Sequence, residues 1–326
     1  MKLKQFHDEY WWPDNCKRLR ECTLAGYRGT WNKAIEPKFG DWEMDDITAR
    51  DIEVWLHSDF VKPGPAGSAW STLRIILREA YRYDLVEKDI TRNVKNVPKP
   101  PPPKEQPVLD KTQVKELLDG LKGTEIEPFV LVSVTLGLRK EEGCALEWED
   151  INLRTGEVSI TKGAQWIDGK EVINPPKTER SYRTILLPEF ATKRLKEIKD
   201  DLQAKGMLHP RITAGMTPNR VTSVYQREVK ARGLPYVPPK NLRHSWATIA
   251  LREGVPLATV SRQLGHYDVE VTANHYIVSN EEDFKQAQAA FQKAVSATPT
   301  SFDLDKQDTA WKRFKYIWRY ITRGEL

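Results

Sequence analysis

Apolar residues in the N-terminal part of the chain recur at intervals of three and four, which is the spacing of one face of an α-helix. One such run follows Thr48-Ala49-Arg50-Asp51, a sequence with the form of a capping box. Residues 62–65, Lys-Pro-Gly-Pro, separate it from a longer run. The pattern predicts two helices, whose apolar faces hold Ile52, Trp55 and Leu56 in the first and Trp70, Leu73, Ile76, Leu77 and Tyr81 in the second.

Residues 98–107 are rich in proline, which continues neither a helix nor a sheet and favours a stiff, extended polyproline conformation. A chain of 326 residues is long enough for about two domains. We therefore predict a helical domain over residues 1–97, a linker over 98–107, and a second domain over 108–326 that includes a C-terminal extension, 278–326.

The second domain alternates between helical and strand patterns. Residues 111–121 and 128–136 have helical spacing, and Gly137 is suited to the left-handed conformation that ends a helix. Residues 157–160 and 182–187 alternate as strands do, with a hairpin turn at Asp168-Gly169 between them. From residue 189 onward the patterns are mostly helical. The expected fold class is mostly α with a small antiparallel sheet, α+β.

Composition excludes several classes of protein. The longest apolar stretch, residues 129–138, is too short to cross a bilayer, which takes about 20 residues, and the N-terminus lacks the apolar core of a secretion signal. The cysteines Cys16, Cys22 and Cys144 have no metal-ligand spacing, so we expect reduced thiols in a cytoplasmic protein. A net charge of +5 is too small to establish a nucleic-acid partner by itself.

Four short strings in the second predicted domain carry the candidate chemistry. They are Gly137-Leu138-Arg139, Pro176-Lys177-Thr178, Asn241-Leu242-Arg243-His244, and Leu264-Gly265-His266 followed by Tyr276. Guanidinium groups match the geometry of phosphate oxygens, a lysine can protonate a departing oxygen, and a tyrosine can attack phosphorus. Together they supply what is needed to cut a phosphodiester without a metal.

In order and context these strings resemble the tyrosine recombinase (phage integrase) family, over nearly the whole chain. The resemblance implies a helical core-type DNA-binding domain followed by a catalytic domain, the two clamping double-stranded DNA. It implies cleavage through a 3′-phosphotyrosine, reversed by a 5′ hydroxyl of the partner duplex. Because bond energy is conserved, no ATP, metal or other cofactor is expected, and the sequence contains no Walker loop.

The resemblance also assigns the residues that hold the phosphate. Arg139 and Arg243 match the two arginines that stabilise charge on the phosphorane. His266 matches an imidazole that donates to a non-bridging oxygen, ten residues before the tyrosine. Glu142 matches an acidic position that buttresses the site.

Three further residues move protons or form the covalent bond. Tyr276 is the implied nucleophile, and Lys177 matches a hairpin lysine that acts as general acid. Lys240 stands where most relatives carry histidine. It can donate to a phosphate oxygen, but as the base that takes the tyrosine proton it would need a greatly lowered pKa, so that role is open.

Other functions share this inventory. A type IB topoisomerase uses similar residues, and a DNA-binding protein or excision factor could retain the fold without catalysis. Among recombinases, Lys240 and the long extension favour an integrase of a phage or mobile element over a chromosome-dimer resolvase. The expected assembly is a homotetramer on two DNA sites, with accessory excision or DNA-bending proteins as further partners and no membrane.

The extension after Tyr276 predicts two amphipathic helices. The second has a basic face around an apolar stripe of Trp311, Phe314, Trp318 and Ile321. Such a helix could dock on a neighbouring protomer, fold back on its own domain, or bind a membrane surface. We favour docking, because the reaction needs about four subunits on two duplexes.

Overall fold

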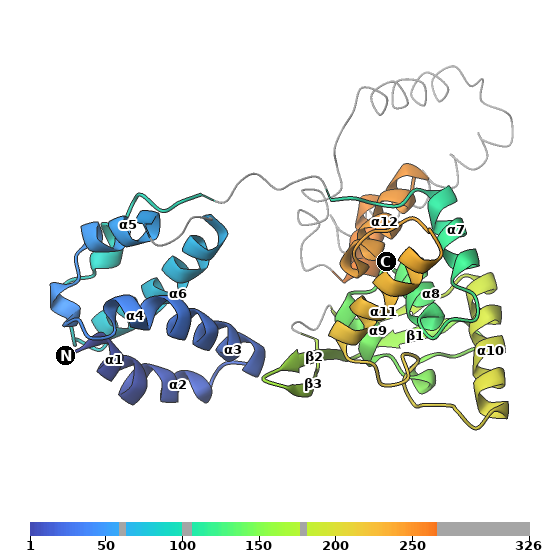
Figure 1. Cartoon of the computed structure of the whole chain (residues 1–326), viewed down its shortest axis with the longest axis horizontal. Helices are drawn as coiled ribbons and strands as arrows, with labels where there is room; N and C mark the ends of the chain where they lie inside the picture. Colours follow the sequence, from blue (N-terminus) through green and yellow to red (C-terminus); the bar gives the residue numbers. More distant parts are fainter. Residues whose placement is uncertain (59–62, 100–105, 177–180, 266–326) are drawn as a thin grey trace, which may run out of the picture. The chain divides into compact units, whose positions relative to one another are not determined.

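The computed structural model describes residues 1–58, 63–99, 106–176 and 181–265. Helices predominate in this part of the chain, with short strands only between residues 157 and 186 (Figure 1). One hydrophobic core is formed by residues from Leu3 to Ala80, and two others by residues from Leu109 to Leu242. The cores thus fall on either side of the proline-rich stretch. Below, residues 1–97 are called the N-terminal part and residues 106–265 the C-terminal part.

The N-terminal part is helical, as predicted. Thr48 and Asp51 exchange hydrogen bonds between side chain and backbone at 3.1 and 3.2 Å, which confirms the capping box at α5 (Ala49–Ser58). Helix α6 (Pro63–Arg82) begins at Pro63, so Pro-Gly-Pro forms its first turn rather than a loop. Tyr81 is 41% exposed, contrary to prediction, because Ala80 faces the core at that end of α6. The remaining elements are α1 (Leu3–Phe6), α2 (Trp12–Cys16), α3 (Glu21–Thr30), α4 (Glu36–Phe39), π-helical turns His7–Trp11 and Trp31–Ile35, and 3-10 turns Met44–Asp46 and Ile90–Arg92.

The C-terminal part is built around α8 (Glu127–Leu136), whose apolar side chains are buried on all sides. It packs against α7 (Lys111–Gly120), α10 (Glu189–Ala204) and α12 (Pro239–Arg252), which surround it in Figure 1. The helices predicted over residues 111–121 and 128–136 and the mostly helical pattern after residue 189 are confirmed. The remaining helices are α9 (Lys140–Ala145), α11 (Pro218–Ala231), α13 (Leu257–Leu264) and the 3-10 turn Trp148–Asp150.

The strands are antiparallel and few, as predicted, and they divide into two ladders. Strand β1 (Glu157–Ile160) pairs with β4 (Arg183–Leu186), and β2 (Gly163–Ile167) pairs with β3 (Lys170–Asn174). Asp168 and Gly169 have φ of 47° and 78°, as the predicted tight hairpin turn requires. Figure 1 shows β2 and β3 extending from the body of the C-terminal part as a separate hairpin.

Among the described helices, none combines the length and apolar character needed to cross a membrane. Within the same residues, Cys16, Cys22 and Cys144 are free thiols, as expected. Cys144 is buried, and burial raises the pKa of its thiol to about 12. A thiol held protonated in this way is a poor nucleophile.

Candidate functional site

The structure describes four of the predicted site residues, Arg139, Glu142, Lys240 and Arg243. Lys177, His266 and Tyr276 lie outside the described residues, and their assignments stay predictions, as do those for the extension after Tyr276. The site is therefore built here from its arginines and the carboxylate between them.

Arg139 is positioned by the turn that joins α8 to α9. Gly137 ends α8 with φ of 67°, the left-handed conformation predicted for it. Arg139 is the N-cap residue immediately before α9, and its backbone N–H donates to Oε2 of Glu142 at 2.8 Å. The guanidinium also donates to Oε1 of Glu142 at 2.9 Å. Glu142, three residues later, thus fixes both the backbone and the side chain of Arg139.

Arg243 reaches the same place from α12. It is 6% exposed and donates to the carbonyl oxygens of Gly137 at 2.9 Å and Leu264 at 2.8 Å. Arg139 donates to the carbonyl oxygens of Leu264 and Gly265 at longer distances, 3.4 and 3.3 Å. The two arginines therefore converge on the carboxyl end of α13, where backbone carbonyls carry partial negative charge. The next residue in the chain is His266.

Glu142 is buried among positive charges. Arg183, on β4, donates to its two oxygens at 3.0 and 2.8 Å. Burial alone would raise the pKa of Glu142, but the hydrogen bonds and charge of Arg183, with the charges of Arg139 and Arg243, lower it to about 2. Glu142 is therefore ionised at neutral pH. Three guanidinium groups and one carboxylate leave a positive surplus, which suits an anionic substrate.

Arg183 was not singled out from the sequence as a site residue. The available signal was its position in the predicted strand, because it shares a face with the buried Ile185 two residues later. A charged side chain on the inward face of a strand needs a partner. The partner, Glu142, is 41 residues away in the sequence.

Two lysines differ in how they are held. Lys240 is exposed in the first turn of α12, and its side chain makes no hydrogen bond or ion pair within the described part of the chain. Lys162, between β1 and β2, contacts Glu147 at 2.5 Å and Asp150 at 3.2 Å. Burial would lower the pKa of Lys162, but these two carboxylates outweigh it and raise the pKa. Lys162 lines the same pocket as Arg139 and Glu142, which sequence reasoning did not foresee.

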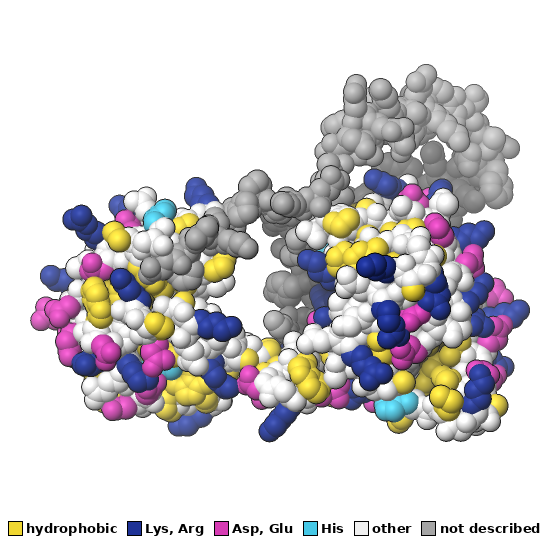
Figure 2. Space-filling model, in the orientation of Figure 1, with side chains coloured by type: hydrophobic (Ala, Val, Ile, Leu, Met, Phe, Trp, Pro, Cys, Tyr) yellow, Lys and Arg dark blue, Asp and Glu magenta, His cyan; other side chains and the backbone are white. Residues whose placement is uncertain are grey.

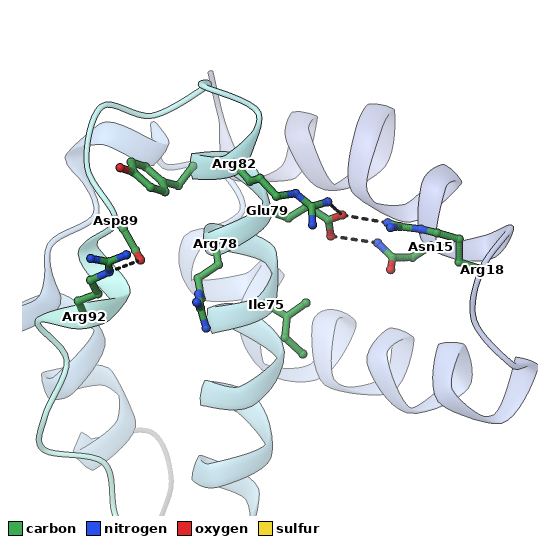
Figure 3. Close-up of a pocket in the computed structure, with 9 residues that line it drawn as sticks. Asn15, Arg18, Ile75, Arg78, Glu79, Arg82, Asp89 and Arg92 are labelled. Atoms are coloured by element: carbon green, nitrogen blue, oxygen red, sulfur yellow. Dashed lines mark hydrogen bonds and ion pairs between the residues drawn. The ribbon is translucent and has the colours of Figure 1, made fainter. Parts of the chain in front are cut away.

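A groove in the N-terminal part is rich in arginine (Figure 3). It has a volume of about 530 Å³ and lies between α2, α6 and the loop around residue 90. Buried Glu79 accepts hydrogen bonds from Arg18 and Arg82 at 2.9 Å each. Asp89 holds Arg92 at 3.1 Å, and Arg78 has no partner among the described residues. Elsewhere on the face seen in Figure 2, basic and acidic side chains are intermixed.

Metal chemistry has no obvious ligand set in the part of the chain that is described. Groups of three or more His, Cys, Asp or Glu side chains that could hold an ion are absent from residues 1–58, 63–99, 106–176 and 181–265. The arrangement that is present, guanidinium groups fixed around one carboxylate, can bind a phosphate and stabilise added negative charge.

The sequence matches the phage integrase family over residues 107–283. The chain belongs to this family. Residues 2–58 match the N-terminal SAM-like domain found in phage integrases. Similar curated proteins include a tyrosine recombinase XerC-like protein of Caldanaerobacter subterraneus, 24% identical over 79% of this chain and 74% of the relative. The ICEBs1 integrase of Bacillus subtilis is 25% identical over 75% of this chain and 70% of its own length.

Solved structures of integrases have the same fold. The Tn1549 transposon integrase in complex with transposon right end DNA superimposes with a TM-score of 0.72, covering 89% of this chain and 99% of that one at 16% identity. A lambda integrase tetramer bound to a Holliday junction gives a TM-score of 0.61, covering 85% of this chain and 78% of that one at 19% identity. The mostly helical fold with small antiparallel ladders is thus the integrase fold, as predicted.

Proposed function

We propose that this integrase-family chain is a site-specific DNA recombinase that cuts and rejoins duplex DNA through a 3′-phosphotyrosine at Tyr276. The observation that carries the proposal is the convergence of Arg139 and Arg243 on the carboxyl end of α13. These arginines come from segments about a hundred residues apart, and they meet immediately before His266. Membership of the family supplies the reaction class, DNA strand cleavage and transfer.

In the proposed mechanism the arginines hold the non-bridging oxygens of the scissile phosphate. The Tyr276 hydroxyl loses its proton to solvent water as its oxygen attacks phosphorus, and the bond from phosphorus to the 5′ oxygen breaks. Lys177 gives that oxygen a proton, and His266 donates to a non-bridging oxygen. Lys240 donates to the phosphate from the first turn of α12. A 5′ hydroxyl from the partner duplex then attacks the phosphotyrosine, so each strand is rejoined without ATP.

The proposed partner is double-stranded DNA in the cytoplasm, bound by domains 1–97 and 108–326 on either side of linker 98–107. The arginine groove beside α6 supports contact between the N-terminal domain and the DNA backbone, because clustered guanidinium groups attract phosphates.

We propose a tetramer on two duplexes, with extension 278–326 docking on a neighbouring protomer. Deleting residues 279–326 should then leave single-site binding and remove cooperative assembly. We propose that the chain is the integrase of a mobile element and that accessory excision or DNA-bending proteins are further partners.

The direct test is capture of the covalent intermediate on a nicked suicide substrate carrying the element's own junction sequence. Wild-type protein should form an adduct that survives denaturant, and Tyr276→Phe should bind the same DNA and form none. Tyr236→Phe is the matched control, because it removes an exposed hydroxyl of the C-terminal part outside the proposed site. An adduct in Tyr276→Phe would reject the assignment of the nucleophile.

The same experiment separates the alternatives. A protein that only binds DNA would form no adduct in any variant. Relaxation of a supercoiled plasmid that lacks the recombination site would instead identify a type IB topoisomerase. Strand exchange between two site-bearing duplexes, absent from either alternative, is the outcome that we expect.

A further inference from the structure

Arg183 contacts the predicted site without belonging to any of the four strings that define it. Its side chain is 6% exposed. It donates to both oxygens of Glu142 and to the carbonyl of Ser181 at 3.3 Å, and its Nε donates to the carbonyl of Gln263 at 2.7 Å. The donor groups of this guanidinium are therefore directed at protein oxygens, and Arg183 is poorly placed to take a phosphate as well.

Glu142 is shared between Arg183 and Arg139. Oε1 accepts from both guanidinium groups at 3.0 and 2.9 Å, and Oε2 accepts from Arg183 and from the backbone of Arg139 at 2.8 Å each. Because a carboxylate offers about four lone-pair positions, these bonds saturate it. If Arg183 were absent, the hydrogen bonds left to Glu142 within the described residues would come from Arg139, and its charge would act more strongly on that guanidinium.

The two arginines also differ in their freedom to bind another ligand. The side chain of Arg139 is 38% exposed, and its contacts with the carbonyls of Leu264 and Gly265 are long, 3.4 and 3.3 Å. Exchanging such contacts for charge-assisted bonds to a phosphate costs little. Arg183 is buried and bidentate, a geometry that only arginine can supply.

Arg183 reaches the end of α13 as well. An added Cβ at Gly265 would lie 3.2 Å from its Nη1, so Arg183 packs directly against the turn that ends this helix. One side chain on β4 thus touches both the carboxylate of Glu142 in the first turn of α9 and the turn after α13. These are the two segments that present Arg139 and precede His266.

We propose that Arg183 is a positioning residue that neutralises Glu142 and so leaves the Arg139 guanidinium available to the scissile phosphate. The inference rests on the proposed recombinase function. In this inference Glu142 and Arg183 act together. The carboxylate of Glu142 orients Arg139, and Arg183 weakens the hold of that carboxylate on Arg139 by sharing its charge.

The test compares Arg183→Gln with the double variant Arg183→Gln/Glu142→Gln. DNA affinity is measured first, and the cleavage rate is then measured at saturating protein on the suicide substrate. With Arg183→Gln, the unshared carboxylate should retain Arg139, and the bound complex should cleave about a hundredfold more slowly. Removing the carboxylate as well should release Arg139, and the double variant should cleave at least about tenfold faster than Arg183→Gln. A purely structural role predicts the opposite, a second loss added to the first.

A matched control breaks a similar ion pair away from the site. Arg194 donates to both oxygens of buried Glu127 at 2.6 and 3.0 Å. Arg194→Gln and Arg194→Gln/Glu127→Gln should lower thermal stability but leave the cleavage rate of the bound complex unchanged. If Arg183→Gln cannot be folded, Arg183→Lys replaces it, because lysine cannot hold both oxygens, and Glu142→Gln should again restore rate.

Two results would overturn the inference: wild-type cleavage by bound Arg183→Gln or Arg183→Lys, or no gain in rate on adding Glu142→Gln. Failure of the proposed function looks different. In that case the wild-type protein itself forms no adduct, whereas the inference about Arg183 is tested only against a wild-type adduct that has been observed.

Discussion

Replacing Glu142 by glutamine should change how the stability of the protein depends on pH. The folded-state pKa of Glu142 is about 2, against an ordinary value of 4.5. A difference of about 2.5 units corresponds to roughly 3 kcal/mol of stabilisation of the folded state. The side chain is only 10% exposed, so solvent screening reduces this figure little.

The sign follows from the direction of the shift. Because folding lowers the pKa, the contribution is complete above about pH 4.5 to 5 and is lost as the pH falls toward 2. With these two pKa values, about 2 kcal/mol should already be lost at pH 3. Glu142→Gln has no group to titrate there, so its stability should fall less steeply than that of the wild type.

At neutral pH the variant should be less stable by about 3–5 kcal/mol, because Arg183 is left buried without its counter-charge. Urea unfolding at pH 7, 5, 4 and 3 gives the free energy of unfolding at each value. The gap between variant and wild type should narrow by about 2 kcal/mol from pH 7 to pH 3. Other carboxylates titrate in both proteins and cancel in the difference.

Glu116→Gln is the control, because it removes an exposed carboxylate on α7 that has no hydrogen bond or ion pair among the described residues. Its curve should run parallel to that of the wild type. If the Glu142→Gln curve also ran parallel between pH 7 and pH 3, Glu142 would not be held ionised by its arginines, and the charge balance derived for the site would be wrong.

Three further predictions concern other parts of the molecule. Gly137→Ala should lower the free energy of unfolding in urea by about 2–4 kcal/mol, because φ is 67° and an added Cβ would lie 2.9 Å from Leu264 and Trp246. Gly123→Ala is the control: its φ is 78° but its Cβ would meet open space, so it should lower the free energy of unfolding by only about 1–2 kcal/mol. Lys177→Ala should slow cleavage of ordinary DNA, and a substrate whose leaving 5′ oxygen is replaced by sulfur should restore the rate, because a sulfur leaving group needs no proton. Any loss of cleavage rate in Lys162→Ala should not be restored by the same substrate. Arg78→Ala should lower the slope of log affinity against log salt by about 1 at every DNA sequence, and an unchanged slope would remove this groove from the DNA contact.

The sequence predicted features whose causes lie within a few residues. Thr48 and Asp51 form the capping box, Asp168 and Gly169 the hairpin turn, and Gly137 the left-handed end of α8. Each depends on a local backbone preference that the residue types themselves carry. Arg139 and Arg243 were also singled out from the sequence, because each stands in a distinctive string near a helix end; the structure brings their side chains together, and their roles stay predictions.

Features that depend on distant pairing were missed. Strand patterns gave the positions of β1 and β4 and the hairpin turn between β2 and β3, but they did not show that the small antiparallel sheet divides into two ladders. The ion pair of Glu142 with Arg183 spans 41 residues, and that of Glu127 with Arg194 spans 67. The sequence indicates that a charged residue on an inward face needs a counter-charge. The identity of the partner depends on how β4 and α10 pack on the cores of the C-terminal part.

The bonds made by Arg139 and Arg243 imply different parts for them in the proposed site. Arg243 is buried and holds two carbonyls at 2.8 and 2.9 Å, so its position is set by the fold before any ligand arrives. Arg139 is partly exposed and makes long contacts with the same helix end, so its guanidinium can turn toward a phosphate at small cost. In the proposed reaction the site binds the scissile phosphate, passes through a phosphorane and then reverses, and one fixed and one adjustable donor suit these steps. Glu142 and Arg183 together determine how strongly the Arg139 guanidinium is held away from the phosphate. We therefore expect the cleavage rate to depend on the charge balance of this pair rather than on the number of arginines in the site.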